Sequence, residues 1–412
     1  MQTNLAEFMR TTADGEEAER ILRKCVHCGF CTATCPTYQL LGDELDGPRG
    51  RIYLIKQMVE GAPVTQSTLT HLDRCLTCRS CETTCPSGVQ YGRLVEIGRK
   101  QAETQVARPL GQRLLRRALA TILPQPALFT PAFRVGMKFR HVLPKKLRDK
   151  LPIQRDPGVR PTTVHARKML MLEGCVQPAM MPNVNSATRA RVRCARHPAR
   201  RRAVGRLLRA IRLHMSYHDE ALDDMRRNID AWWPYVESGV EAIVMNASGC
   251  GATVREYGHL LRDDPRYAEK AQRISDMTRD VSELLPDFEN ELSEPARRTR
   301  VAARPACGRL PPRRARSSTA SRCAAASRTC SRRSASEVRL PADSHLCCGS
   351  AGTYSVLQPA LSYRLRDQKL GKIKETEPQA IVSGNVGCIA HLQSGTSTPV
   401  MHWIELVDRM IR

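Results

Sequence analysis

Two short runs of cysteines carry the clearest chemistry in this sequence of 412 residues. Each run has the spacing C-x2-C-x2-C-x3-C-P, and the two runs begin fifty residues apart, at Cys25 and Cys75. Gaps of two residues let three successive thiolates converge on one face of a four-iron cubane, and the whole spacing is typical of chains that bind [4Fe–4S] clusters. The proline after each run ends the local turn, because proline has a fixed φ and no N–H.

The fourth cysteine of each run lies outside the tight turn and, in two-cluster ferredoxins, ligates the other cluster. The sequence therefore predicts two clusters with crossed ligand sets: Cys25, Cys28, Cys31 and Cys85 for the first, and Cys75, Cys78, Cys81 and Cys35 for the second. Zinc also binds closely spaced cysteine pairs, but two identical runs with trailing prolines fit zinc poorly. Disulfides are not expected, since no secretory signal precedes the runs.

Residues 1–105 hold both runs and are predicted to form a helical ferredoxin domain. Residues 16–24 look helical, and residues 49–60 place apolar side chains at helical spacing before Gly61. This pattern favours helices over the compact β-hairpin type of ferredoxin. Arg49 and Arg51 stand at a predicted helix start, where they either hold the anionic clusters or are solvated.

Residues 106–165 are rich in proline, lysine and arginine and are predicted to be a linker or a docking surface. A basic amphipathic stretch such as 114–123 can lie on an acidic membrane face, and a solvated linker is the alternative. No eighteen consecutive residues are apolar, so no transmembrane helix is predicted. Seventeen cysteines without a signal peptide indicate the cytoplasm, with peripheral attachment to the inner membrane left open.

Three apolar stretches that end at cysteines lie in the second half of the chain, at 168–175, 241–251 and 380–388. We expect them to be buried strands of a parallel sheet, whose carboxyl ends usually gather ligands. The adjacent thiols of Cys347 and Cys348 could bridge neighbouring irons or be buried structural groups. The predicted fold is thus mixed α+β and α/β, with a helical ferredoxin domain before an α/β region. The candidate further metal site is Cys175, Cys250, Cys347, Cys348 and Cys388.

These features together resemble the iron–sulfur subunits of glycolate oxidase (glycolate dehydrogenase). The resemblance spans most of the chain and rests on the two runs and on segments 42–51, 228–234, 247–251 and 343–354. It implies a two-cluster module followed by two cysteine-rich "CCG" repeats. The expected divisions are 1–105 for the module, 106–165 for the linker, 166–290 for the first repeat, 291–340 for an aberrant segment and 341–412 for the second repeat.

The resemblance also implies the chemistry of the complex. A separate FAD flavoprotein subunit would oxidise glycolate to glyoxylate, and this chain, as a non-catalytic subunit of that oxidoreductase, would pass electrons toward a quinone-linked acceptor. No flavin is expected on this chain, which shows no G-x-G-x-x-G motif. Equivalent subunits serve lactate and anaerobic glycerol-3-phosphate dehydrogenases, and these substrates remain alternatives.

Two arginine-rich windows depart from the family pattern. Residues 189–212 hold ten arginines and no acid where the first repeat should carry its central Cys-Cys-Gly, and residues 297–339 hold thirteen arginines and one glutamate. We hypothesise that both are out-of-frame translations of a GC-rich gene, and genuine insertions are the alternative. Without the central cysteines of the first repeat, a third cluster is not expected to assemble.

The net charge of +24 is concentrated in three places. The two windows carry +10 and +12 and residues 106–160 carry +11, which leaves −9 for the rest of the chain. A metal-containing regulator that binds nucleic acid is the alternative from another functional class. The windows lack interleaved aromatic residues and any recognised nucleic-acid-binding motif, so no nucleic-acid partner is expected.

Overall fold

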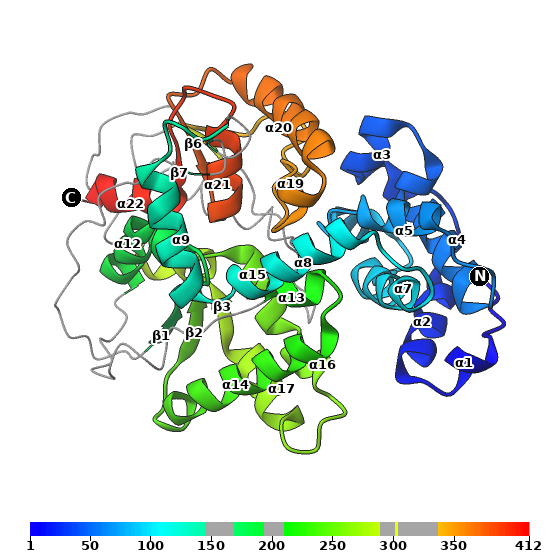
Figure 1. Cartoon of the computed structure of the whole chain (residues 1–412). Coiled ribbons are helices and arrows are strands. Elements are labelled where there is room, and N and C mark those ends of the chain that lie inside the picture. The colour runs from blue at the N-terminus through cyan, green and yellow to red at the C-terminus, as the bar shows by residue number, and fades with distance from the viewer. Residues whose placement is uncertain are drawn as a thin grey trace. The chain divides into compact units, whose positions relative to one another are not determined.

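The structure, a computed structural model, describes residues 1–144, 148, 151, 169–192, 210–288, 301–303 and 337–411 (Figure 1). Most of both arginine-rich windows lies outside the described residues. The chain divides into two compact units, Met1–Arg117 with His345–Lys369, and Ala118–Ser344 with Leu370–Arg412. Each unit therefore combines segments that are far apart in the sequence. The sequential domain boundaries expected from the sequence stay a prediction.

The first unit is helical. Its first helices confirm the predictions at 16–24 and 49–60, since α2 spans Ala13–Lys24 and α4 spans Pro48–Val59. The Thr12 hydroxyl caps α2 by accepting from the Gly15 N–H. The other elements are α1 (Glu7–Arg10), η1 (Phe30–Thr34), α3 (Pro36–Leu41), η2 (Glu44–Asp46), α5 (Gln66–Asp73), α6 (Ser80–Thr84), α7 (Tyr91–Gln105), α19 (Tyr354–Leu357) and the first part of α20 (Pro359–Lys374).

One apolar core holds these helices together. Ile21 of α2, Ile55 of α4 and Leu94 of α7 are fully buried in it, as are Leu69 and Leu72 of α5. Burying such a side chain contributes about 1.5–3 kcal/mol. The same core includes cysteines of both runs, so the helices fix the two cysteine loops to one frame.

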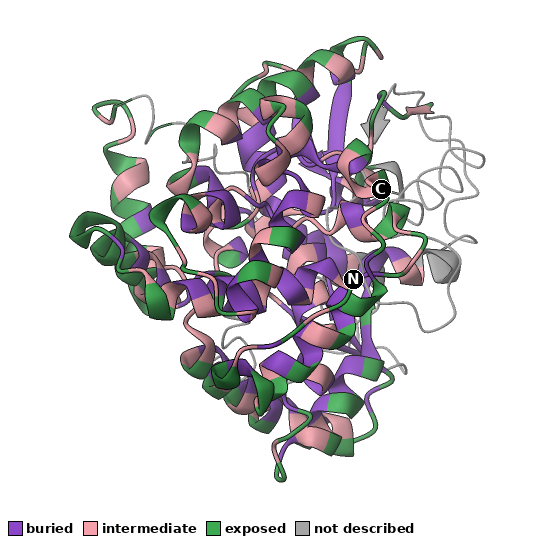
Figure 2. Ribbon diagram, turned by 90° about the vertical axis from the view of Figure 1, so that its right-hand side faces the viewer, coloured by how far each residue is buried: buried purple, intermediate pink, exposed green. Residues whose placement is uncertain are grey.

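The second unit contains two parallel sheets. One has the order β1-β2-β3 and the other β5-β4-β6-β7, and every strand pair is parallel. The sequence-predicted strands are β1 (Met169–Leu172), β2 (Ala242–Met245) and β6 (Ala380–Ser383), which are buried along their whole length (Figure 2). The parallel arrangement is therefore confirmed, with the three strands distributed over two sheets. The remaining strands are β3 (Thr278–Asp280), β4 (Val301–Ala303), β5 (Val338–Arg339) and β7 (Val400–His402).

Helices connect and cover these strands. The longest, α14 (His218–Glu237), contains Trp232, which stacks on Tyr257 with ring centroids 6.2 Å apart. The others are α9 (Pro126–Lys138), α11 (Gln177–Met180), α12 (Pro182–Val192), α13 (Ala210–His214), α15 (Ser248–Arg255), α16 (Tyr257–Leu260), α17 (Ala268–Met277), η3 (Val281–Phe288), α21 (Val386–Gln393) and α22 (Trp403–Ile411). In the described part of the chain, no helix combines the length and apolar character needed to cross a bilayer.

The stretch 106–165 contains regular structure. Helix α8 (Leu110–Ile122) runs from the first unit into the second, and α9 follows it. Most of the described residues of this stretch are therefore helical. Its carboxyl-terminal part, residues 152–165, lies outside the described residues.

Candidate metal centre

The two cysteine loops share an unusual backbone. His27 and Gly29 lie on either side of Cys28 with φ of 56° and 83°, and Thr77 and Arg79 lie on either side of Cys78 with φ of 51° and 56°. A residue other than glycine costs about 1–2 kcal/mol in this left-handed region. Strain of this kind gathers at ligand clamps, where the surrounding structure holds it in place. Both loops therefore have the backbone of a preformed binding site.

A short helical turn follows each loop and leads to the fourth cysteine. Element η1 ends before Cys35 and α6 ends before Cys85. The equivalent hydroxyls of Thr34 and Thr84 meet 3.0 Å apart. The two runs are thus packed against each other through matching residues, and each fourth cysteine lies next to the loop of the other run.

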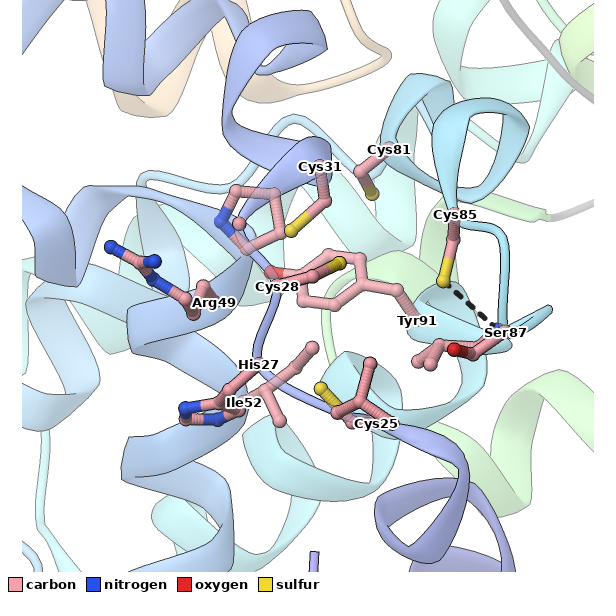
Figure 3. A pocket seen from close by; sticks show the side chains of 14 residues that line it. Cys25, His27, Cys28, Cys31, Arg49, Ile52, Cys81, Cys85, Ser87 and Tyr91 are labelled. Carbon is pink, nitrogen blue, oxygen red and sulfur yellow. Dashed lines mark hydrogen bonds between the residues drawn. The ribbon is translucent and has the colours of Figure 1, made fainter.

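The first predicted ligand set lines one pocket. Cys25, Cys28, Cys31 and Cys85 all border it, and so does Cys81 of the second set (Figure 3). Burial, with smaller contributions from the neighbouring thiols of Cys25 and Cys85, raises the pKa of the Cys31 thiol to about 11. Thiols crowded in this way resist ionising together unless a cation compensates their charge. The donor set therefore fits an iron–sulfur cluster.

The second predicted set is more deeply buried. Cys35, Cys75 and Cys81 are buried and Cys78 is partly exposed. Burial raises the pKa of the Cys81 thiol well above its usual value, and the neighbouring thiols that add to this effect are Cys78, Cys75 and Cys35. The structure thus brings together the four cysteines of each predicted set, including the fourth cysteine contributed by the other run.

Hydrogen-bond donors surround the second set. The Tyr91 O–H donates to the Cys75 Sγ at 3.5 Å, and the Thr77 N–H reaches the same sulfur at 3.4 Å. The Thr37 hydroxyl, which donates to the Asp46 carbonyl at 2.8 Å, lies 3.2 Å from the Cys35 Sγ. Donors of this kind stabilise charge on the sulfurs and shift the potential of a bound cluster.

A buried charge network adjoins these donors. Arg51, 1% exposed, donates from Nε to the His71 carbonyl at 2.7 Å, from Nη1 to the Thr37 Oγ1 at 3.2 Å and from Nη2 to the Asp46 Oδ1 at 3.3 Å. Arg74 donates to the other carboxylate oxygen of Asp46 at 2.8 Å. The structure therefore distinguishes the two arginines of the predicted helix start. Arg51 is buried beside Cys35, whereas Arg49 is about one-third exposed and pairs with Glu44 at 2.6 Å.

Asp43, Asp46 and His71 lie close enough together to suggest a separate cation site. Both carboxylate oxygens of Asp46 are already occupied, however, by the guanidinium groups of Arg51 and Arg74. Two fixed positive charges disfavour a third cation there. The group is better explained as a structural ion network.

Arg99 of α7 forms hydrogen bonds with the backbone and a side chain of the second cysteine loop. Its Nη2 donates to the carbonyls of Leu72 at 2.8 Å and Cys75 at 2.6 Å, and its Nη1 donates to the Thr77 Oγ1 at 2.9 Å. Sequence reasoning missed Arg99, Thr37 and Tyr91. Thr37 and Tyr91 stand shortly after the two runs, which was a usable signal, whereas Arg99 carries no motif of its own.

The Cys-Cys-Gly segment belongs to the first unit. Cys347 and Cys348 are buried, and Gly349 has a φ of 84°. A Cβ at Gly349 would lie 2.6 Å from the Ser362 carbonyl oxygen, so only glycine fits. The Tyr354 O–H donates to the Arg74 carbonyl at 3.1 Å, and Ser80 Oγ donates to the His345 carbonyl at 3.4 Å. The segment thus packs against the second cysteine run.

The other cysteines of the candidate further site belong to the second unit. Cys175 follows β1, Cys250 lies in α15 after β2, and Cys388 lies in α21 after β6. Burial raises the pKa of the Cys250 thiol to about 12, with a contribution from nearby Cys175. The Ser248 N–H donates to the Gly384 carbonyl at 3.4 Å, so the loops after β2 and β6 touch. A site shared with Cys347 and Cys348 stays a prediction.

Comparison with known proteins agrees with this geometry. A family model described as a 4Fe-4S dicluster domain matches residues 21–89, which contain both runs, and one described as a cysteine-rich domain matches residues 315–393. The glycolate oxidase iron-sulfur subunit of Escherichia coli (strain K12) is 46% identical over 415 residues, covering 100% of this chain and 99% of that protein. The chain belongs to the glycolate oxidase iron–sulfur subunit family.

More distant relatives extend the comparison. The probable glycolate oxidase iron-sulfur subunit of Bacillus subtilis (strain 168) is 28% identical over 432 residues, covering 94% of this chain and 91% of the relative. Lactate utilization protein A of the same strain is 24% identical over 205 residues, covering 47% of this chain and 78% of its own length. Glycolate oxidase iron–sulfur subunits are thus similar to this chain over nearly its whole length, and the lactate protein over about half of it.

The family match also bears on the arginine-rich windows. The cysteine-rich domain match begins at residue 315, inside the window 297–339. Part of that window therefore lies within the matched cysteine-rich domain. The out-of-frame hypothesis stays a prediction, which resequencing of the gene would test.

Proposed function

We propose that this chain is the electron-transfer subunit of a complex that oxidises glycolate. It would receive electrons from an FAD-containing flavoprotein subunit and pass them toward a quinone-linked acceptor. The choice of glycolate is supported by the 46% identical relative. The electron-transfer role is supported by the two sets of thiols, each of which draws its fourth member from the other cysteine run.

The proposed ligands of one [4Fe–4S] cluster are Cys25, Cys28, Cys31 and Cys85, and those of the other are Cys75, Cys78, Cys81 and Cys35. A bound [4Fe–4S] cluster accepts and releases one electron, at a potential set by hydrogen bonds, charge and solvent exposure. The residues of this chain supply these influences. Tyr91 donates to a ligand sulfur, Arg51 adds a buried positive charge, and the helical core keeps both loops rigid.

Metal analysis of the anaerobically purified chain tests the number of clusters. We expect about eight irons and eight acid-labile sulfides per chain, with an EPR spectrum of two interacting four-iron centres after reduction. About four irons, or zinc in place of iron, would contradict the proposal. About twelve irons would show that the Cys347–Cys348 region binds a further cluster, contrary to our expectation.

Serine substitutions test the crossed ligand sets. Cys85→Ser should reproduce the EPR change of Cys28→Ser, and Cys35→Ser should reproduce that of Cys78→Ser, because each pair contributes to one cluster. Cys175→Ser, in the second unit, is the control and should retain both signals. If Cys85→Ser instead matches Cys78→Ser, each run would ligate its own cluster and the crossed assignment would be wrong.

The substrate is tested with the reconstituted complex. The chain is mixed anaerobically with its flavoprotein partners, and the visible absorbance of the clusters is followed after adding glycolate, lactate or glycerol 3-phosphate. We expect glycolate to bleach the clusters fastest, and no bleaching without the flavoprotein. Faster bleaching by lactate would favour the alternative suggested by the similarity to lactate utilization protein A.

A further inference from the structure

Helix α9 has two apolar sides, only one of which is covered. Phe133 is 6% exposed and stacks on Phe129, with ring centroids 5.7 Å apart. On the other side, the exposed fraction is 44% for Leu128, 57% for Val135, 54% for Phe139 and 81% for Val142. An ordinary surface helix has a polar side facing water, so this second apolar side calls for an occupant.

The exposed side chains form one stripe, which we call the α9 stripe. Its members Leu128, Val135, Phe139 and Val142 follow one another at intervals of seven, four and three residues, which place side chains on one face of a helix. The turn beyond α9 keeps this arrangement, since the Phe139 N–H donates to Val135 O and the Val142 N–H donates to Phe139 O. Pro131 and Ala132, between the first two members, are exposed as well.

The sequence on either side of the α9 stripe is strongly basic. Residues 106–148 contain ten lysines and arginines and no aspartate or glutamate. Arg108 and Arg116 are engaged in ion pairs with Asp73 of α5. Arg134, Lys138 and Arg148, by contrast, are exposed around the stripe. The surface thus combines large apolar side chains with exposed basic ones.

We infer that the α9 stripe binds the surface of an anionic lipid bilayer. A helix that lies in a membrane interface inserts its apolar face among the acyl chains and keeps lysine and arginine at the headgroups. Each basic residue near an anionic surface strengthens the electrostatic attraction to it. The exposed basic side chains beside the stripe complement anionic headgroups, which is the charge match that a lipid surface requires. This inference goes beyond the electron-transfer proposal and does not depend on the cluster ligands.

Vesicle flotation tests the inference with the purified, cluster-loaded chain. We expect the chain to float with vesicles of phosphatidylcholine and phosphatidylglycerol, to remain behind with pure phosphatidylcholine, and to dissociate as salt is raised. Phe139→Ser should lower the partition coefficient about tenfold, since it removes an inserted aromatic side chain. Arg134→Glu should lower it several-fold at low salt.

Matched control variants distinguish binding through the α9 stripe from nonspecific binding to vesicles. Phe8→Ser changes a phenylalanine of similar exposure, 48%, on α1 of the first unit, and Arg273→Glu reverses an exposed charge on α17. Both controls should float like the unaltered chain. Iron content and the thermal midpoint establish that each variant is folded and loaded.

Two results would overturn the inference. One is equal flotation of Phe139→Ser and Phe8→Ser. The other is loss of binding to the flavoprotein subunit in Phe139→Ser while flotation is unchanged, since the stripe would then be a protein-docking face. Neither result depends on the iron count or on bleaching by glycolate. The experiments can therefore contradict this inference without contradicting the proposed function, and the reverse.

Discussion

The two cysteine loops have the same spacing and left-handed residues at equivalent positions, yet their surroundings differ. In the first loop Cys28 is exposed, and Val26 and Phe30 beside it are 68% and 62% exposed. In the second loop Cys75 and Cys81 are buried. The first loop meets solvent through apolar side chains, whereas the second is enclosed by donors and charges.

This difference shows how one motif serves two roles. The motif specifies the ligands, and the residues outside it set the reduction potential through charge, hydrogen bonds and solvent exposure. Positive charge and O–H donors favour the more negative, reduced state of a cluster. The second cluster, beside Arg51 and Tyr91, should therefore have the higher potential, and the exposed first loop is the better place for exchange with a partner.

The largest expected effect comes from Arg51→Met. The substitution leaves the buried Asp46 carboxylate with one guanidinium instead of two, and breaking a buried pair costs about 3–5 kcal/mol. It also removes a positive charge near Cys35, which should lower the potential of the second cluster by on the order of 100 mV. Thermal unfolding and an EPR-monitored redox titration measure the two effects.

Two further variants control this prediction. Arg51→Lys keeps the positive charge but loses the planar guanidinium group. The reduction potential of the second cluster should therefore stay closer to that of the unaltered chain than the thermal stability does. Arg49→Met, on the same helix, removes a partly exposed pair with Glu44 worth less than about 1 kcal/mol. If Arg49→Met shifted the second potential as strongly as Arg51→Met, the proposed contrast between the loops would be wrong.

A smaller effect is expected at Gly29, where the loops differ in sequence. The second loop places Arg79 at the equivalent position, but a Cβ at Gly29 would lie 2.8 Å from the Arg49 Nη1. Gly29→Ala should therefore cost about 2 kcal/mol, from left-handed strain together with the displaced arginine. Gly88→Ala, at a φ of 63° with open space around it, isolates the strain alone and should cost about 1 kcal/mol. Unfolding in denaturant measures the loss of stability in both variants. Equal losses would mean that contact with Arg49 adds nothing to the cost at Gly29.

Much of this architecture follows from local sequence signals. Eight cysteines with trailing prolines predict the ligand sets, and apolar periodicity predicts α2, α4, β1, β2 and β6. These features depend on neighbours in the chain, such as the glycine that follows α4 or the cysteine beyond each strand. They are therefore visible without knowledge of the tertiary fold.

Other features depend on contacts between distant segments. Arg51 bonds to the carbonyl of His71, twenty residues away, and the Tyr354 O–H bonds to the carbonyl of Arg74, 280 residues away. Nothing near Tyr354 in the sequence indicates that the Cys-Cys-Gly segment packs with the first unit. The exposure of the α9 stripe also depends on the tertiary fold, because periodicity shows that a face is apolar but not whether that face is covered.

The smallest expected effect on the contrast between the loops comes from Tyr91→Phe. The variant removes one oxygen and keeps the ring in the core, so the fold should be retained. Loss of the O–H donor to Cys75 Sγ should lower the second potential by roughly 20–60 mV, the equivalent of one hydrogen bond. The first potential should be unchanged, although the Tyr91 ring also borders the first pocket. A redox titration that resolves both clusters measures this, and equal shifts of the two potentials would mean that Tyr91 acts through packing rather than through its hydrogen bond.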